Sequence, residues 1–196
     1  MKKGLAVFLG LAGALAVIAL FFGGTYNALV SAEETVKQAW AQVENVYQRR
    51  LDLIPNLVET VKGYAAHEQE TFIAVTEARS KAAGTLSPGM LNDPQKFAEF
   101  QESQTALNSA LGRLLVIVEK YPELKANENF LSLQAQLEGT ENRIAVERGR
   151  FNEAAQGFNT RLRKFPANFI GGLFGFKLKE YFKADAQAAA APKVTF

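Results

Sequence analysis

The sequence predicts an all-α protein, in which an N-terminal transmembrane helix is followed by an antiparallel, up-and-down four-helix bundle. Three observations predict this class. A long uncharged stretch opens the chain, the later segments repeat apolar residues at intervals of three and four, and no alternating strand pattern of useful length competes. We expect an anchor over residues 1–25, a helical bundle over 26–166, an amphipathic aromatic segment over 167–183 and a disordered Ala-rich tail over 184–196.

The anchor is predicted from residues 4–24, which are apolar or Gly throughout. At a rise of about 1.5 Å per residue, this helix covers a hydrocarbon core of about 30 Å. A cleaved signal peptide is the alternative. Its apolar stretch usually has about 7–15 residues before a small-x-small cleavage site, whereas this stretch is longer and residues 25–27 form a poor site. We therefore expect an uncleaved, single-pass anchor.

Charges on the two sides of the anchor predict its orientation. Lys2 and Lys3 precede it, while Glu33, Glu34 and one lysine, Lys37, follow it. Because positive charge is retained in the cytoplasm, we expect a cytoplasmic N-terminus, an extracytoplasmic bundle and location in the cell inner (cytoplasmic) membrane.

Two helices are expected between the anchor and residue 75. The apolar positions of the first are Leu29, Val36, Trp40, Val43 and Tyr47; those of the second are Leu57 or Val58, Val61, Tyr64, Ala65, Phe72 and Val75. Pro55 stands between the two sets and fits either a hairpin or a kink in one long helix. We favour the hairpin, because two helices of similar length then bury each other's apolar faces.

The third helix has the most regular pattern. Asp93 is placed to cap it, Pro94 suits its first position, and it is expected to run to about Lys120. Only Gln104 interrupts an apolar face made of Phe97, Phe100, Leu107, Leu111, Leu114, Val118 and Tyr121.

A long fourth helix is expected after Tyr121-Pro122. Its apolar residues follow heptad-like intervals as far as Pro166, which cannot continue a helix without strain. Gly139, Gly149 and Gly157 lie within it, and we expect close backbone packing or a local kink at these glycines.

Composition excludes several classes of function. There is no cysteine, so disulfides, thiolate catalysis and cysteine metal sites are excluded. Apart from Lys2 and Lys3, the other 20 of 22 basic residues are balanced by 20 acidic ones, so nucleic acid is not an expected partner. The sole histidine, His67, expected on a helix, lacks the second histidine of a HExxH zinc site. We expect no cofactor, no metal and no enzymatic activity; the alternative is a metal-dependent or other envelope enzyme with its site in the bundle.

Several blocks of the sequence form a specific pattern: RRLDLIPNLVETVKGYA at residues 49–65, residues 121–126, LEGTENRI at residues 137–144, Phe158-Asn159, Phe165-Pro166 and residues 174–176. Together these blocks, of which the first is the most specific, resemble the LemA family. The resemblance implies a single-pass bacterial membrane protein with a helical-bundle domain and no established activity. Phe151-Asn152 departs from the Tyr-Asn that the family pattern predicts, which puts a polar contact of that ring in doubt.

Two groups of residues are candidates for contact with other molecules. A polar cluster is predicted from Arg49, Arg50, Asp52, Glu138, Glu141 and Arg143, either as an internal ion-pair network or as a surface that a partner protein recognises. A membrane contact is predicted from Phe169, Phe174, Phe176, Tyr181 and Phe182, interleaved with Lys177, Lys179 and Lys183. The alternative is that these rings cover the open end of the bundle.

From these features we expect a non-enzymatic scaffold or adaptor of the bacterial cell envelope. Its expected partners are the lipid bilayer, other membrane proteins and further copies of itself in a homo-oligomer. A membrane-shaping oligomer is a third interpretation.

Overall fold

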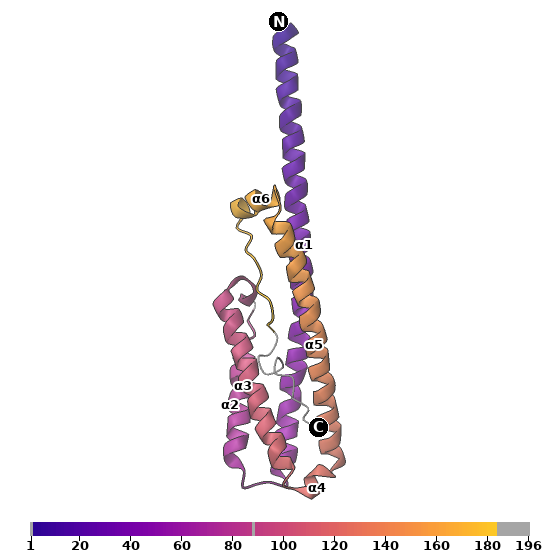
Figure 1. Cartoon of the computed structure of the whole chain (residues 1–196), viewed down its shortest axis with the longest axis vertical. Coiled ribbons are helices and arrows are strands. Elements are labelled where there is room, and N and C mark those ends of the chain that lie inside the picture. Colours follow the sequence, from indigo (N-terminus) through magenta and orange to yellow (C-terminus); the bar gives the residue numbers. More distant parts are fainter. Residues whose placement is uncertain (1, 88, 184–196) are drawn as a thin grey trace, which may run out of the picture.

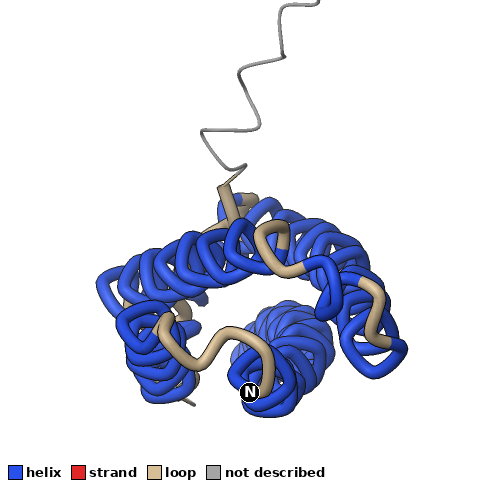
Figure 2. Tube along the Cα trace, turned by 90° about the horizontal axis from the view of Figure 1, so that it is seen from below, coloured by secondary structure: helices blue, strands red, loops and turns tan. Residues whose placement is uncertain are grey.

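The protein is described by a computed structural model that covers residues 2–87 and 89–183. Its helices are α1 (Lys2–Lys62), α2 (Gln69–Thr85), the short 3₁₀ helix η1 (Met90–Asn92), α3 (Pro94–Val118), α4 (Pro122–Lys125), α5 (Glu128–Arg163) and α6 (Ala167–Phe174). Figures 1 and 2 show these helices and their loops, and the described residues contain no strand. The all-α class is confirmed. The expected tail, residues 184–196, lies outside the described residues.

The N-terminal third of α1 stands clear of the rest of the molecule (Figure 1). Among the described residues, α1 is the one helix long and apolar enough to cross a membrane. Its large apolar side chains in this part are exposed, including Phe8, Leu15 and Leu20. The predicted apolar N-terminal helix is therefore present, and those of its side chains that the structure describes are exposed as far as Phe21.

The predicted hairpin at Pro55 is wrong, because α1 continues through Pro55 to Lys62. A proline lacks the N–H that the carbonyl four residues earlier would accept in a helix. Here that carbonyl belongs to Leu51, and Arg79 Nε of α2 donates to it at 2.7 Å. The neighbours Ile54 and Leu57 stay buried on the apolar face. The chain reverses only at residues 63–68, so the expected second helix is divided between the end of α1 and α2.

The third helix agrees with its prediction. Asp93 accepts hydrogen bonds from the backbone N–H groups of Gln95 at 3.0 Å and Lys96 at 3.3 Å. This N-cap and the proline at the first position fix the start of α3. The helix ends at Val118, two residues before the expected end.

The fourth helix is preceded by the short helix α4 and begins with its own cap. Asn127 Oδ1 accepts from the backbone N–H of Phe130 at 3.0 Å, and α5 then runs to Arg163. Close backbone packing at the three glycines of α5 is not found, because a Cβ added at any of them would meet nothing within 4 Å. Beyond α5, the chain forms α6 and then a segment without regular structure, residues 175–183.

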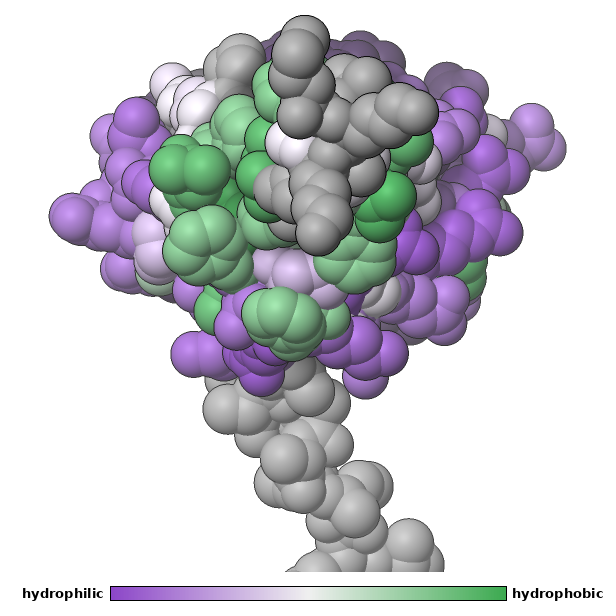
Figure 3. All heavy atoms as spheres, turned by 90° about the horizontal axis from the view of Figure 1, so that it is seen from above, coloured by the Kyte–Doolittle hydropathy of each residue, from purple (hydrophilic) through white to green (hydrophobic). Residues whose placement is uncertain are grey.

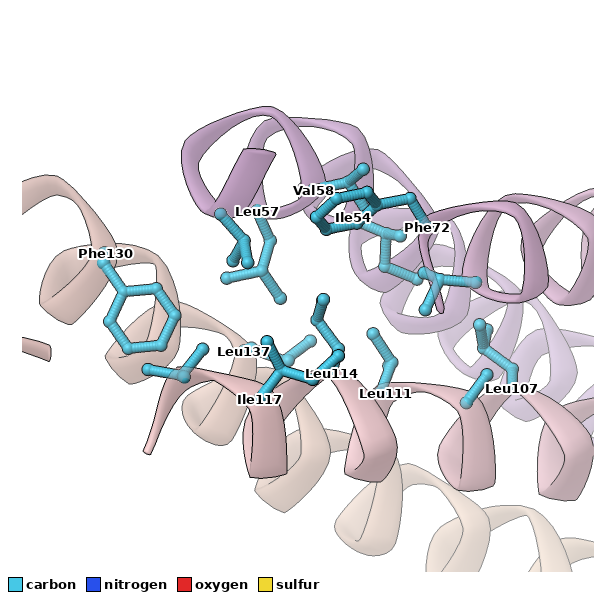
Figure 4. Close-up of a cluster of buried hydrophobic side chains, with 14 of the residues drawn as sticks. Ile54, Leu57, Val58, Phe72, Leu107, Leu111, Leu114, Ile117, Phe130 and Leu137 are labelled. Carbon is cyan, nitrogen blue, oxygen red and sulfur yellow. The ribbon is translucent and has the colours of Figure 1, made fainter. Parts of the chain in front are cut away.

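Two clusters of buried side chains form the core. The distal cluster, far from the N-terminus, joins α1, α2, α3 and α5 (Figure 4) and includes Ile54, Phe72, Leu114 and Leu137. The proximal cluster joins α1, α3, α5 and α6 through aromatic rings and is described below. Burying a Leu or Phe side chain contributes about 1.5–3 kcal/mol, so these clusters hold the helices together. Among the helices, α1 lies along α5 and α2 lies along α3 (Figure 1). The antiparallel four-helix bundle stays a prediction.

Candidate functional site

The centre of the domain contains a buried guanidinium. Arg50 of α1 is only 1% exposed, and its Nη1 donates to Glu141 Oε1 of α5 at 2.9 Å and to Asn108 Oδ1 of α3 at 2.7 Å. Its Nη2 donates to Gln104 Oε1 of α3, and its Cζ lies 5.2 Å from the centre of the Tyr47 ring. Gln104, the polar interruption of the apolar face of α3, is thus a partner of Arg50. The guanidinium joins three helices.

The predicted polar cluster is brought together only in part. Arg50 and Glu141 form the ion pair, whereas Arg49, Asp52, Glu138 and Arg143 are exposed. Asp52 accepts from Gln48 Nε2 on the same helix, at 2.8 Å. The internal network is therefore smaller than expected and includes amide side chains that the sequence reasoning missed. Beside it opens a cleft of about 250 Å³ that Arg50, Gln104 and Glu141 help to line.

A second buried site holds the segment of residues 176–183, which we call the C-terminal strap. Asn159 of α5 donates to the carbonyl of Lys179 at 2.8 Å and accepts from the N–H of the same residue at 2.8 Å. Asn152, seven residues earlier on α5, makes the same pair of bonds with Phe182, at 3.0 and 2.9 Å. Two asparagine amides thus bind the backbone of the strap.

Two side chains of the strap are buried in the domain. Lys179 is 4% exposed, and its Nζ donates to Glu33 Oε1 of α1 at 2.7 Å and to Asn92 Oδ1 of η1 at 2.6 Å. Glu33 Oε2 also lies 3.9 Å from Lys37 Nζ. The hydrogen bond that Lys37 donates to Glu34 raises the pKa of Lys37 above the ordinary lysine value.

Phe182 is the other buried side chain of the strap. Its ring lies among rings of α1, α3 and α5, with centroid distances of 6.1 Å to Trp40, 5.1 Å to Phe97, 6.3 Å to Phe100 and 5.4 Å to Phe151. Such pairs contribute about 0.5–1.5 kcal/mol each beyond the area that they bury. The Phe151 ring is fully buried in this cluster, so the ring that departs from the family pattern has apolar neighbours.

The predicted membrane-contact residues are therefore of two kinds. The prediction of Phe182 as a membrane contact is wrong, because its ring lies in the core. Lys179 does not point to lipid either, because its ammonium group donates to Glu33 and Asn92. Phe176 is half-buried, and Tyr181 accepts a hydrogen bond from Asn159 Nδ2 at 2.9 Å. For these residues, the alternative that the rings cover the bundle fits the structure better.

Phe169 and Phe174 of α6 remain exposed, by 63% and 58%. They lie beside the point where the apolar stretch of α1 ends: the ring of Phe169 is 6.4 Å from that of Phe22, and the ring of Phe174 is 4.7 Å from that of Tyr26. Seen from the N-terminal side (Figure 3), hydrophobic residues gather over the middle of this face and hydrophilic residues surround them. Other exposed apolar residues of this region are Leu20, Phe21, Phe165 and Leu173.

No group of three or more His, Asp or Glu side chains able to hold a metal ion occurs within residues 2–87 and 89–183. His67, expected on a helix, lies exposed in the turn between α1 and α2.

Comparison with known proteins gives the family. The family model described as "LemA family" matches residues 39–196, which include the Arg50 site, the strap, and the two asparagines that bind it, Asn152 and Asn159. The chain belongs to the LemA family. This LemA chain is also similar to the magnetosome protein MamQ of Magnetospirillum gryphiswaldense, with 29% identity over 187 residues, covering 87% of this chain and 68% of that protein. It is similar to the magnetosome protein MamQ 1 of Paramagnetospirillum magneticum, with 28% identity and the same coverage. Protein LemA of Metamycoplasma hominis is 25% identical over 171 residues, covering 87% of this chain and 73% of that protein.

Proposed function

We propose that this LemA-family protein is a single-pass, non-enzymatic scaffold of the bacterial cell envelope, which holds other membrane proteins at the outer side of the cytoplasmic membrane. The observation that carries the proposal is α1 itself. One helix supplies both an exposed apolar stretch long enough for a bilayer and, from Leu29 onward, a buried face of the domain. The domain is therefore attached to its anchor without a linker.

The same proposal includes the bundle architecture. The distal half of α1 and helices α2, α3 and α5 would form an antiparallel, up-and-down four-helix bundle. Short connections at residues 63–68, 86–93 and 119–127 support it, as does a distal core to which all four helices contribute. Such a bundle presents long, ordered helical faces to a partner.

Contact between α6 and the bilayer is part of the proposal as well. The exposed rings of Phe169 and Phe174 lie at the end of the apolar stretch of α1, where a helix leaving the membrane meets the headgroup region. A second contact beside the anchor would restrict how the domain tilts on the membrane.

Quenching by bromine-labelled lipids tests the contact. We expect the fluorescence of a Phe169→Trp variant, reconstituted as the full chain, to be quenched by lipids brominated near the headgroup. Val116 of α3 is equally exposed and lies near the end of α3 that faces away from the N-terminus, so Val116→Trp is the matched control. The native Trp40 is buried and gives the same background in both variants. Equal quenching of the two variants would contradict the contact.

Orientation and scaffolding are tested in cells. An enzyme reporter that is active only outside the cytoplasm, fused after Phe196, should be active, because Lys2 and Lys3 are expected to hold the N-terminus inside. An inactive reporter in a well-expressed fusion reverses the orientation. Crosslinking in intact cells, followed by identification of the captured proteins, should recover a defined membrane protein; recovery of this chain alone would contradict the scaffold.

A further inference from the structure

A shallow groove lies where the apolar stretch of α1 meets the rest of the domain. It has a volume of about 570 Å³ and is lined by α1 on one side and, on the other, by the end of α5 and the residues that lead into α6. Figure 1 shows these two parts beside α1, where the part of α1 that stands clear begins. The apolar lining includes Leu20, Phe21 and Phe165, which are exposed by 77%, 57% and 85%. Arg161 and Lys164 give the groove a basic side.

The groove extends across the end of the apolar stretch. At a rise of about 1.5 Å per residue, Leu20 lies about 6 Å before Gly24 and Ala28 lies about 6 Å after it. Arg161 Nη1 donates to the carbonyl of Ala28 at 2.8 Å, which holds the guanidinium at that level. The headgroup layer of a bilayer is about 5–8 Å thick on each side. With residues 4–24 in the bilayer, as proposed above, Leu20 would therefore lie at the depth of the acyl chains and Arg161 at the depth of the phosphates.

The charge beside the groove has one sign. Residues 154–179 include five basic residues and no acidic one. Lys179 is paired with Glu33, but Arg161 and Lys164 form no ion pair with any other residue that the structure describes. A guanidinium carries five N–H donors, so the bond of Arg161 to a backbone carbonyl leaves other donors for a ligand. A ligand that matches this side of the groove carries negative charge.

We propose that the groove binds an anionic phospholipid, with the lipid phosphate at Arg161 and Lys164 and an acyl chain along Leu20 and Phe21. Arginine binds phosphate oxygens through paired N–H donors and lysine binds them as a point charge, so the two side chains suit one phosphate group. The bilayer around α1 presents the same order of groups, phosphate above acyl chain, at the same depths. The inference rests on the membrane insertion of α1 under the proposed function, and it adds the class of lipid that the domain selects.

Quenching of tryptophan by brominated lipids measures which lipid occupies the groove. The full chain with Leu20→Trp is reconstituted in phosphatidylcholine vesicles that contain a minor fraction of either phosphatidylglycerol or phosphatidylcholine brominated on its acyl chains. We expect stronger quenching by the brominated phosphatidylglycerol, because the anionic lipid is enriched in the groove. Leu15→Trp is the matched control, since Leu15 is an exposed leucine of the same apolar stretch. Five residues before Leu20, at about 3.6 residues per turn, it points to another side of α1, so both lipids should quench it equally.

Substitutions of basic residues test the phosphate site. In the Leu20→Trp chain, Lys164→Gln or Arg161→Gln should lower the preference for phosphatidylglycerol by about fivefold, the effect of one lysine or arginine near an anionic surface. Arg163→Gln removes the same charge from a residue that does not line the groove, and it should leave the preference unchanged. Arg161→Gln also removes a bond to the Ala28 carbonyl, so Lys164→Gln decides the test if the Arg161 variant unfolds.

Failure of the lipid site and failure of the proposed function give different results. If neither tryptophan is quenched by either lipid, α1 is not in the bilayer, and the proposed function fails together with the lipid site. The lipid site alone is refuted if both tryptophans are quenched but Leu20→Trp shows no greater preference for phosphatidylglycerol than Leu15→Trp. It is equally refuted if Arg163→Gln lowers the preference as much as Lys164→Gln, because the attraction is then spread over the whole surface.

Discussion

Glu33→Gln tests whether the ion pair of Lys179 is as buried as the structure has it. The Lys179 side chain is 2% exposed and lies 2.7 Å from Glu33 Oε1, while the Glu33 side chain is 21% exposed. Glutamine keeps the shape and one acceptor oxygen but removes the charge, so the ammonium is left with only neutral acceptors, among them the Asn92 oxygen at 2.6 Å. Removing one partner of a buried pair costs about 3–5 kcal/mol. Because Glu33 is partly exposed, we expect the lower end, about 3 kcal/mol.

The assay is thermal unfolding of the full chain in detergent micelles at low ionic strength, followed by circular dichroism. A loss of about 3 kcal/mol corresponds to a fall in melting temperature of about 6–12 °C for a chain of this size. Lys179→Met removes the buried charge itself, so adding Glu33→Gln to it should cost little more. The reasoning is refuted if Glu33→Gln changes stability by less than about 0.5 kcal/mol, or if the costs of the two single substitutions simply add.

Three further changes test the helices. Arg79→Ala should lower the free energy of unfolding by about 1 kcal/mol in the native chain and by clearly less in a Pro55→Ala background, because the alanine supplies the N–H that the Leu51 carbonyl otherwise lacks. Equal costs in the two backgrounds of this double-mutant cycle would show that the Arg79 hydrogen bond does not compensate for the proline. Gly149→Ala should stabilise α5 by up to about 1 kcal/mol, measured as a higher melting temperature, since an added Cβ meets no atom within 4 Å; a lower melting temperature would show unseen crowding. Leu111→Asp buries an unpaired carboxylate in the distal core and should abolish the cooperative unfolding transition, and an unchanged circular dichroism spectrum and melting temperature would remove Leu111 from the core.

The helices could be predicted wherever their signals are local. Asp93 and Pro94 mark the start of α3 within two adjacent residues, and the spacing of its apolar side chains gives its buried face. Pro55 led to the wrong prediction of a hairpin, because the group that replaces its missing N–H is distant in the sequence. The donor that replaces its missing N–H is Arg79, which follows 24 positions later on another helix, and no pattern around residue 55 indicates it.

The strap could not be predicted, for a related reason. Residues 175–183 have no helical or strand period, so their rings and lysines read as a membrane-binding segment. A signal was present elsewhere: Phe151-Asn152 and Phe158-Asn159 repeat an aromatic residue and an amide seven positions apart on one helix. Amides at that spacing lie on one side of α5 and are buried or half-buried, where they need hydrogen-bond partners. Of the Arg50 site, the sequence predicted the charged residues. Gln104 stood out as the one polar residue on the apolar face of α3 but was not connected with Arg50, and no pattern indicated Asn108.

Because α1 is one continuous helix, its length fixes the distance between the end of the apolar stretch and the turn at residues 63–68. From Gly24, where the apolar stretch ends, to Lys62 the helix rises about 57 Å at 1.5 Å per residue. With residues 4–24 in the bilayer, as proposed, the turn at residues 63–68 would stand about that far from the membrane surface when α1 is upright. Because no flexible joint intervenes, a tilt of the anchor by about 20°, common for membrane helices, would sweep this tip sideways by about 20 Å. A partner protein bound at this turn would therefore be displaced sideways when the anchor tilts, for example in response to a change of bilayer thickness, because α1 is one continuous helix.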